Sequence, residues 1–195
     1  MQEELSAAIL CGGRSSRFVQ DKTLVSINGK PMVQHVYHAV KGFSSDIFLV
    51  SKWIEPGKYQ FLDIPVVYEP YKDYAPLYGI EQALIHAKNE WVLVLAADMP
   101  NLRPQIFQRL LDARKKTSSL IIPMTDRLHP LFALYSKTCL PLIRQRIQND
   151  ELKLQKLAEI PNSEVVSIEG EWKRAFVNIN TQEDLGDFYA MNSRS

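Results

Sequence analysis

The sequence predicts an α/β fold, with a mostly parallel central sheet and helices on both of its faces in a Rossmann-like arrangement. Three observations predict it. Strand-sized runs rich in Val, Ile and Leu recur, amphipathic stretches with helical spacing lie between them, and no linker, repeat or low-complexity block divides the 195 residues. Strands that are apolar throughout are typical of parallel sheets covered by helices. We therefore expect a single domain over residues 1–195.

The first part of the chain holds the most regular elements. The strand-sized runs lie at residues 7–10, 47–50, 66–68, 91–95 and 120–122. Apolar side chains at helical spacing predict helices within residues 32–40, 77–87 and 106–111. Pro31 and Pro104 stand at the first turns of two of these helices, where the missing N–H of proline is tolerated.

The pattern is less regular after residue 123. A strand is expected at residues 131–135, a helix at 140–147, and extended chain at 165–168 and 175–179. Thr181 opens a final helix in a capping box, because its hydroxyl can accept a hydrogen bond from the N–H of the third helical residue. Residues 191–195 are mostly polar and without periodicity, so we expect a frayed tail.

Composition and charge exclude several classes of protein. With 46% hydrophobic residues, 23% charged residues and a net charge of +1, the chain is neither disordered nor a typical nucleic-acid binder. No apolar run approaches the roughly 18 residues that would cross a bilayer. Acidic residues near the start argue against a secretory signal, so we expect a cytoplasmic protein. Cys11 and Cys139 are far apart in the sequence and are expected to be buried thiols.

A glycine loop follows the first predicted strand. Gly12 and Gly13 allow the backbone to approach a ligand and to direct N–H groups at an anion, while Arg17 and Lys22 supply positive charge. The loop is neither a Walker A motif nor the dinucleotide-binding glycine pattern. Residues 11–30 hold four basic side chains and one acidic side chain. This predicts a phosphate site; a plain strand-to-helix turn with a solvated basic loop is the alternative.

Asp98 stands at the end of what should be a central strand, directly after an apolar run. An unpaired carboxylate in apolar surroundings is unfavourable, and a hard cation such as Mg²⁺, bridging to phosphate, would offset that penalty. The alternative is an ordinary helix N-cap or a surface acid.

Weaker signals lie in the middle and near the end of the chain. Glu69 precedes a Pro-initiated helix whose N-terminus could bind a purine or its ribose, although an ordinary helix start is about as plausible. His129 is expected to be structural. Asn178 and Asn180 would share one face of a strand by the period of two, which suits a polar ligand, or they cap a strand-to-helix junction.

Several segments, in order, resemble the MobA family of molybdenum cofactor guanylyltransferases. Residues 10–22 (LCGGRSSRFVQDK) are similar to its L-A-G-G-x-S-x-R-M-G-x-D-K signature. Residues 75–79 (APLYG), 97–100 (ADMP), 129–131 (HPL) and 176–181 (FVNINT) are similar to its later motifs. The first motif is shared with cytidylyltransferases and sugar-phosphate nucleotidyltransferases, and the last two narrow the resemblance.

The resemblance implies a Mg²⁺-dependent nucleotidyltransferase with a fold of the GT-A-like superfamily. It would transfer GMP from GTP to molybdopterin and release pyrophosphate, with the nucleotide bound by the N-terminal half and the acceptor by the C-terminal half. Proteins that load molybdopterin and molybdoenzyme chaperones are implied as partners.

Site residues carried over by position fall into three groups. The expected catalytic residues are Lys22, Arg17 and Asp98, with Asp98 as the metal ligand. The expected nucleotide-binding residues are Leu10, Cys11, Gly12, Gly13, Lys22, Ser51, Glu69, Gly79 and Asp98. The expected acceptor-binding residues are Asn178 and Asn180.

The sequence departs from the family pattern at several of its motif positions. Val19 replaces a loop glycine and Ala75 the first glycine of G-P-L-x-G. Ser51 stands where the family often has Asn, and Glu69 stands where it usually has an Asp that reads the guanine. Two alternatives therefore stay open. One is a related cytidylyltransferase or sugar-phosphate nucleotidyltransferase, and the other is a non-catalytic nucleotide-binding module.

Overall fold

A seven-stranded sheet, in the order β5-β4-β1-β6-β8-β7-β9, forms the centre of the computed structural model, which describes residues 4–12, 21–52 and 55–192. Its strands are β1 (Leu5–Leu10), β4 (Asp46–Ser51), β5 (Val66–Tyr68), β6 (Trp91–Ala96), β7 (Leu120–Met124), β8 (Phe132–Ser136) and β9 (Ser163–Ser167). A separate hairpin pairs β2 (Ser26–Ile27) with β3 (Lys30–Pro31).

The pairing confirms a mostly parallel sheet. Strand β1 runs parallel to both β4 and β6, β4 runs parallel to β5, and β7 runs parallel to β9. Only β8 is reversed among the described strands of this sheet, and it pairs antiparallel with β6 and β7. Every residue of β1 is buried, including Ser6, as its mostly apolar sequence predicts for a central strand.

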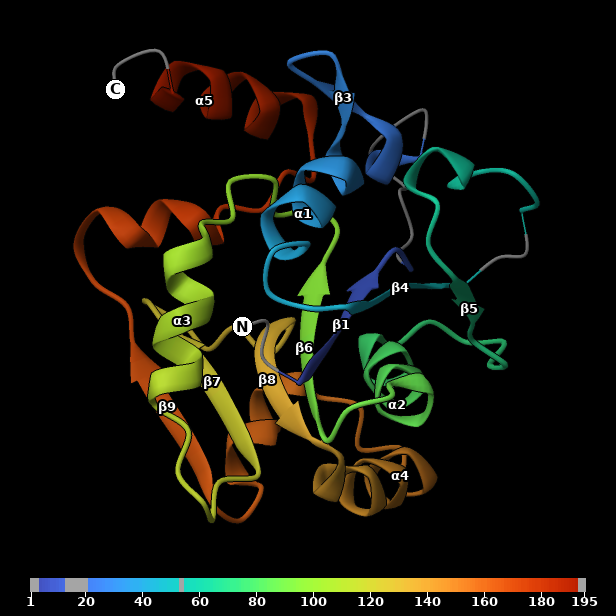
Figure 1. Ribbon diagram of the computed structural model, residues 1–195, viewed down its shortest axis with the longest axis vertical. Coiled ribbons are helices and arrows are strands. Elements are labelled where there is room, and N and C mark those ends of the chain that lie inside the picture. Colours follow the sequence, from blue (N-terminus) through green and yellow to red (C-terminus); the bar gives the residue numbers. More distant parts are fainter. Residues whose placement is uncertain (1–3, 13–20, 53–54, 193–195) are drawn as a thin grey trace.

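Helices cover both faces of the sheet (Figure 1). One core cluster includes apolar side chains of α1 and α3, and the other includes those of α2 and α4. The helices are α1 (Met32–Val40), α2 (Pro76–His86), α3 (Pro104–Asp112), α4 (Leu140–Gln148) and α5 (Gln182–Asn192). Short 3₁₀ helices span Lys22–Leu24, Gln60–Leu62, Lys137–Cys139, Leu154–Glu159 and Gly170–Phe176. The predicted α/β class is confirmed.

Strand register gathers the ends of several strands at one edge. Leu10 lies opposite both Val50 and Ala96, and Ser51 lies opposite Tyr68. The residues that follow β1, β4, β5 and β6 therefore meet, and the segment that leads into the reversed strand β8 joins them. In Figure 1, β1 and β6 point upward toward this edge, at the end where α5 and β3 lie. Ligands of open α/β sheets bind outside such strand ends.

The predicted extended segment at 175–179 is wrong. A 3₁₀ helix over Gly170–Phe176 takes its first residues, and the chain then continues without regular structure to Thr181. None of the strands in the described part of the chain pairs with it; Ile179 instead donates its backbone N–H to the carbonyl of Asp98, at 2.9 Å.

The last helix begins at the predicted capping box and extends into the segment expected to be a frayed tail. The N–H of Asp184, the third helical residue, donates to Thr181 Oγ1 at 3.1 Å, which confirms the cap. Helix α5 continues to Asn192, so residues 191 and 192 are helical rather than part of a tail. Cys11 and Cys139 are free and buried, as expected. Among the described residues, no helix is long and apolar enough to cross a membrane.

Candidate functional site

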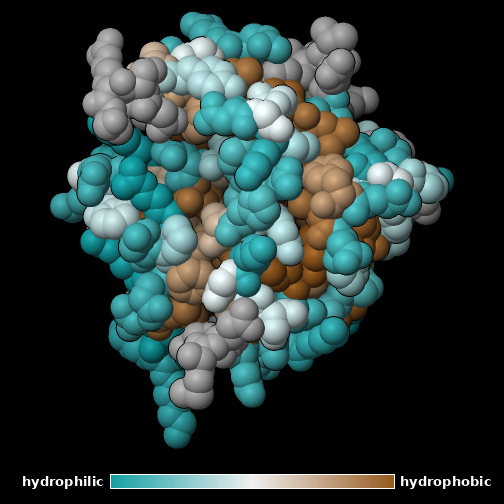
Figure 2. All heavy atoms as spheres, turned by 45° about the horizontal axis from the view of Figure 1, so that its top comes forward, coloured by the Kyte–Doolittle hydropathy of each residue, from teal (hydrophilic) through white to brown (hydrophobic). Residues whose placement is uncertain are grey.

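A cavity of about 180 Å³ opens at the carboxyl ends of the central strands. It is lined by Leu10, Cys11, Gly12, Lys22, Thr23, Glu69, Pro76, Ala96, Ala97, Asp98 and Leu131. Six of these are sequence-predicted site residues: Leu10, Cys11, Gly12, Lys22, Glu69 and Asp98. Figure 2 turns this end of the molecule toward the viewer and shows hydrophobic atoms in hollows within a mostly hydrophilic surface.

Polar side chains from distant segments converge on Asp98. Lys22 Nζ lies 2.7 Å from Asp98 Oδ2 and donates to Asn180 Oδ1 at 3.1 Å. Asn178 Nδ2 donates to Asp98 Oδ1 at 2.9 Å. The structure brings together these four residues, which the sequence pattern also marks as site candidates, although the two asparagines lie in an irregular segment rather than on one face of a strand.

The backbone around Asp98 is fixed on three sides. Ala96 N–H donates to the carbonyl of Leu131 at 2.8 Å, and Ala97 N–H donates to that of Leu10 at 3.1 Å. Ile179 N–H donates to the carbonyl of Asp98 itself. Asp98 is only 8% exposed, so its carboxylate depends on Lys22 and Asn178 for the stabilisation that water would otherwise provide.

The donor set around Lys22 fits a magnesium ion shared with phosphate. Among the described residues, no three His, Cys, Asp or Glu side chains form a group able to hold a metal. Asp98 Oδ2 and Asn180 Oδ1, however, both accept hydrogen bonds from Lys22 Nζ, so two hard oxygen atoms already face one cation. Mg²⁺ is commonly held by one or two carboxylates together with substrate phosphates and water.

A polar network fixes the segment that carries Lys22. Asp21 Oδ1 accepts from the N–H and the hydroxyl of Thr23, each at 2.8 Å, and Asp21 also pairs with Lys58. Burial raises the pKa of Asp21, but the hydrogen bonds from Lys58 and Thr23 outweigh it and hold the pKa below its ordinary value. Asp21 therefore stays ionised. Gly13, Arg17 and Val19 lie outside the described residues, and their roles stay predictions.

Glu69 closes the other side of the cavity. A Cβ atom added to Gly12 or to Gly79 would lie 3.1 Å from Glu69 Oε1. Both positions therefore favour glycine, because there is little space for a side chain. Gly79 thus contacts Glu69 without lining the cavity. Ser51 is buried and its carbonyl accepts from the N–H of Glu69 at 3.0 Å, but Ser51 is not a lining residue either. Burial raises the pKa of Glu69, and the neighbouring Lys52 offsets part of that rise.

A second cavity, of about 450 Å³, lies beside the Asp98 cluster. Its lining residues are Thr125, Asp126, Arg127, His129, Lys173, Arg174, Phe176 and Val177. It adjoins the first cavity because Val177 precedes Asn178 and because His129 is two residues before Leu131. Asp126 is paired with Lys173 at 2.7 Å, so the charges of these two lining residues balance. Arg127 and Arg174 then give the cavity a net positive charge. Sequence reasoning missed these cations, although the adjacent Lys173 and Arg174 were a visible signal.

His129 is a structural residue that also lines this second cavity. Its Nε2 lies 2.7 Å from Thr125 Oγ1, and its ring packs on Phe176 with centroids 4.5 Å apart. Burial, together with the nearby Arg127, lowers the pKa of His129 to about 4. The imidazole is therefore neutral near pH 7.

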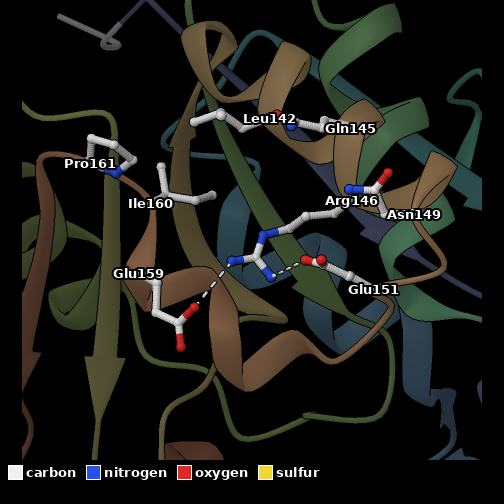
Figure 3. A pocket seen from close by; sticks show the side chains of 8 residues that line it. All are labelled: Leu142, Gln145, Arg146, Asn149, Glu151, Glu159, Ile160 and Pro161. Carbon is white, nitrogen blue, oxygen red and sulfur yellow. Dashed lines mark hydrogen bonds and ion pairs between the residues drawn. The ribbon is translucent and has the colours of Figure 1, made fainter.

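A third cavity, of about 210 Å³, lies at α4 and the connection to β9 (Figure 3). Arg146 reaches across it and pairs with Glu151 at 3.7 Å and Glu159 at 3.4 Å. Helix α4 follows the end of the reversed strand β8, so this cavity belongs to the opposite edge of the sheet. Its arginine joins α4 to the following chain, and none of its contacts with the described residues involves the Asp98 cluster.

Comparisons with known proteins identify a common family. The profile described as a MobA-like NTP transferase domain matches residues 7–164. An Aquifex aeolicus protein named "Probable molybdenum cofactor guanylyltransferase" is 34% identical over 185 residues, covering 95% of this chain and 90% of that protein. A Flavobacterium johnsoniae protein of the same name is 33% identical over 187 residues, covering 95% and 96%.

A solved structure shows the same fold. The molybdopterin-guanine dinucleotide biosynthesis protein A of Archaeoglobus fulgidus superposes with a TM-score of 0.81 at 24% identity, covering 97% of this chain and all of the other (100%).

Proposed function

This chain belongs to the MobA-like NTP transferase family, and we propose that it transfers GMP from GTP to molybdopterin, forming molybdopterin guanine dinucleotide and releasing pyrophosphate. The observation that carries the proposal is the convergence of Lys22, Asp98, Asn178 and Asn180 between two cavities. One cavity lies at the glycine end of β1 and suits a nucleotide. The other is basic and suits an anionic acceptor.

The reaction needs positioning and charge neutralisation more than a protein nucleophile. A phosphate oxygen of the acceptor attacks the α-phosphorus of GTP; the new P–O bond forms as the bond to the β-phosphate oxygen breaks, and pyrophosphate leaves. Lys22 would balance charge on the phosphates, aided by Arg17. Asp98, with Asn180, would hold Mg²⁺ against the phosphates, and the ion would supply further charge neutralisation.

The two cavities divide the substrates between the halves of the chain. The nucleotide would lie against Gly12 and Glu69, and the acceptor would lie toward Asn178 with its anionic groups near Arg127 and Arg174. Proteins that deliver molybdopterin or receive the product are proposed partners. The cytoplasmic location remains a prediction from the sequence.

Paired substitutions test this function. Lys22→Ala and Asp98→Ala should each abolish pyrophosphate release from GTP, Mg²⁺ and molybdopterin, while circular dichroism shows a folded protein. Lys116→Ala, in the exposed turn after α3, is the matched control and should retain wild-type activity. Full activity of either site variant would contradict the assignment.

A further inference from the structure

A lysine is buried directly after β4, next to the glycine end of the cavity. The Lys52 side chain is only 3% exposed, and its Nζ donates to the carbonyls of Tyr71 and Asp73 in the connection between β5 and α2. The ammonium also lies 5.2 Å from the centre of the Tyr74 ring. A buried cation needs such oxygen and aromatic neighbours, because it has lost its hydration.

Lys52 also fixes one oxygen of Glu69. Lys52 Nζ lies 3.8 Å from Glu69 Oε2, and the Glu69 side chain is 6% exposed. The second oxygen, Oε1, then points between Gly12 and Gly79, at the wall of the nucleotide cavity. The ion pair therefore determines which oxygen of the carboxylate faces the cavity.

Holding the β5–α2 connection is not the distinctive contribution of Lys52, since that connection has other attachments. The Tyr71 ring stacks on Tyr78 with centroids 4.0 Å apart, and the Tyr71 hydroxyl donates to Glu81 at 2.5 Å. Arg144 of α4 pairs with Glu81 at 3.2 Å. Within the described residues, the Glu69 carboxylate has Lys52 as its single ion-pair partner.

We propose that Lys52 is a positioning residue: its ion pair holds the Glu69 carboxylate, which the family resemblance implies reads guanine, in the orientation that faces the base. The proposal rests on the function proposed above. A carboxylate only accepts hydrogen bonds, and guanine presents two neighbouring donors, N1–H and the 2-amino group. Adenine and cytosine each present a ring-nitrogen acceptor at the corresponding position, which a carboxylate disfavours.

Inosine triphosphate makes the test specific, because it differs from GTP only by the missing 2-amino group. Calorimetric titration with Mg²⁺ and no acceptor should give wild-type protein about a 10-fold or greater preference for GTP over ITP, since a hydrogen bond to a charged group is lost. In Lys52→Met the ratio should fall toward one. Lys52→Arg, which keeps the charge, should retain most of it.

Each other outcome overturns the proposal. If Lys52 only supports the fold, Lys52→Met weakens GTP and ITP equally and the ratio is unchanged. If wild-type protein does not distinguish the two nucleotides, Glu69 does not read the 2-amino group. Should Lys52→Met fail to fold, Lys52→Gln provides the same comparison, because it keeps a hydrogen-bond donor toward the Tyr71 and Asp73 carbonyls without the charge. A preserved ratio in Glu69→Ala rules out the carboxylate as the reader. The ratio of GTP to ITP affinity is measured without turnover, whereas the proposed transferase activity is measured by pyrophosphate release. A failure of one is therefore distinguishable from a failure of the other.

Discussion

Asn178 orients the carboxylate at the centre of the site. Its amide donates to Asp98 Oδ1, while Lys22 holds the other oxygen. In Asn178→Ala, a largely buried oxygen loses its partner, and we expect unfolding free energy to fall by about 1–3 kcal/mol together with a lower kcat. Urea titration and initial rates measure the two effects. Asn149→Ala, at the exposed C-cap of α4 on the opposite edge of the sheet, is the control and should leave the rate unchanged; equal losses in both variants would contradict a role for Asn178 in the site.

His129 predicts a specific dependence of stability on pH. Burial beside Arg127 lowers the pKa of His129 from 6.5 to about 4 in the folded state, so the fold favours the neutral ring. Its contribution to stability is present above pH 6.5 and is lost as the pH falls from 6.5 toward 4, where the unfolded chain binds the proton first. Asp126 on the same cavity opposes the shift but does not reverse it.

The measurement for His129 is urea unfolding at several pH values between 7.5 and 4. His129→Gln should lose stability less steeply over this window than the wild-type protein, because glutamine does not titrate. His86→Gln, at the exposed end of α2, is the control and should keep the wild-type profile. Parallel profiles for wild type and His129→Gln would show that the ring is not held neutral by the fold.

Individual residues were predictable where they directly follow a strand. Gly12 and Asp98 have signals of their own, namely glycine or charge just after an apolar run, and Lys22 stands out as one of the basic residues of segment 11–30. Lys52 has none, because its importance comes from Glu69, which is 17 positions away and is brought close only by the pairing of Ser51 with Tyr68. Arg127 likewise becomes a site residue only when the chain after β7 meets the 3₁₀ helix at Gly170–Phe176.

At the scale of elements, apolar periodicity succeeded where packing follows from local pattern. All five early strands and the three helices between them lie within a few residues of their predicted positions. The prediction for residues 175–179 failed, because their apolar and polar side chains contact different parts of the structure rather than the two faces of a sheet. Phe176 packs against His129 and Ile179 enters a small cluster with Phe188 of α5, while Asn178 between them donates to Asp98.

The cap of α5 links that segment to the site. Thr181 Oγ1 accepts from the N–H of Asp184, and Asp184 Oδ2 accepts from the N–H of Asn180 at 2.7 Å. Thr181→Ala should reduce unfolding free energy by about 1 kcal/mol, the usual value of an N-cap, and should raise KM as Asn180 loosens. Thr117→Ala, in an exposed turn, is the control. A destabilised variant with unchanged KM would show that helix anchoring and Asn180 placement are independent.

Across the whole molecule, a net charge of +1 conceals a strong local separation of charge. Arg127 and Arg174 face the second cavity, and Lys22 lies at its boundary with the first, whereas Lys58 and Arg146 are each paired with two acids elsewhere. Overall charge thus says little about affinity for a small polyanion. A bound polyanion interacts mainly with charges closer than about one Debye length, because salt screens the more distant ones.

Nucleotide binding should stabilise the entire fold, because the cavity is built from β1, β6, the end of β5 and the start of α2 at once. A ligand at 100 times its Kd that binds only the folded chain contributes about 2.7 kcal/mol, which for a chain of this size raises the Tm by about 5–11 °C. We expect GTP with Mg²⁺ to reach this shift at a concentration where ATP, CTP and UTP give much less, measured by differential scanning fluorimetry. Lys22→Ala should lower the Tm of the unliganded protein, because Asp98 loses its ion-pair partner, and should also reduce the GTP shift measured from that variant's own unliganded Tm. A larger shift with CTP than with GTP would assign the chain to cytidylyl transfer, and equal shifts with all four nucleotides would mean that phosphates alone are recognised and that Glu69 does not select the base.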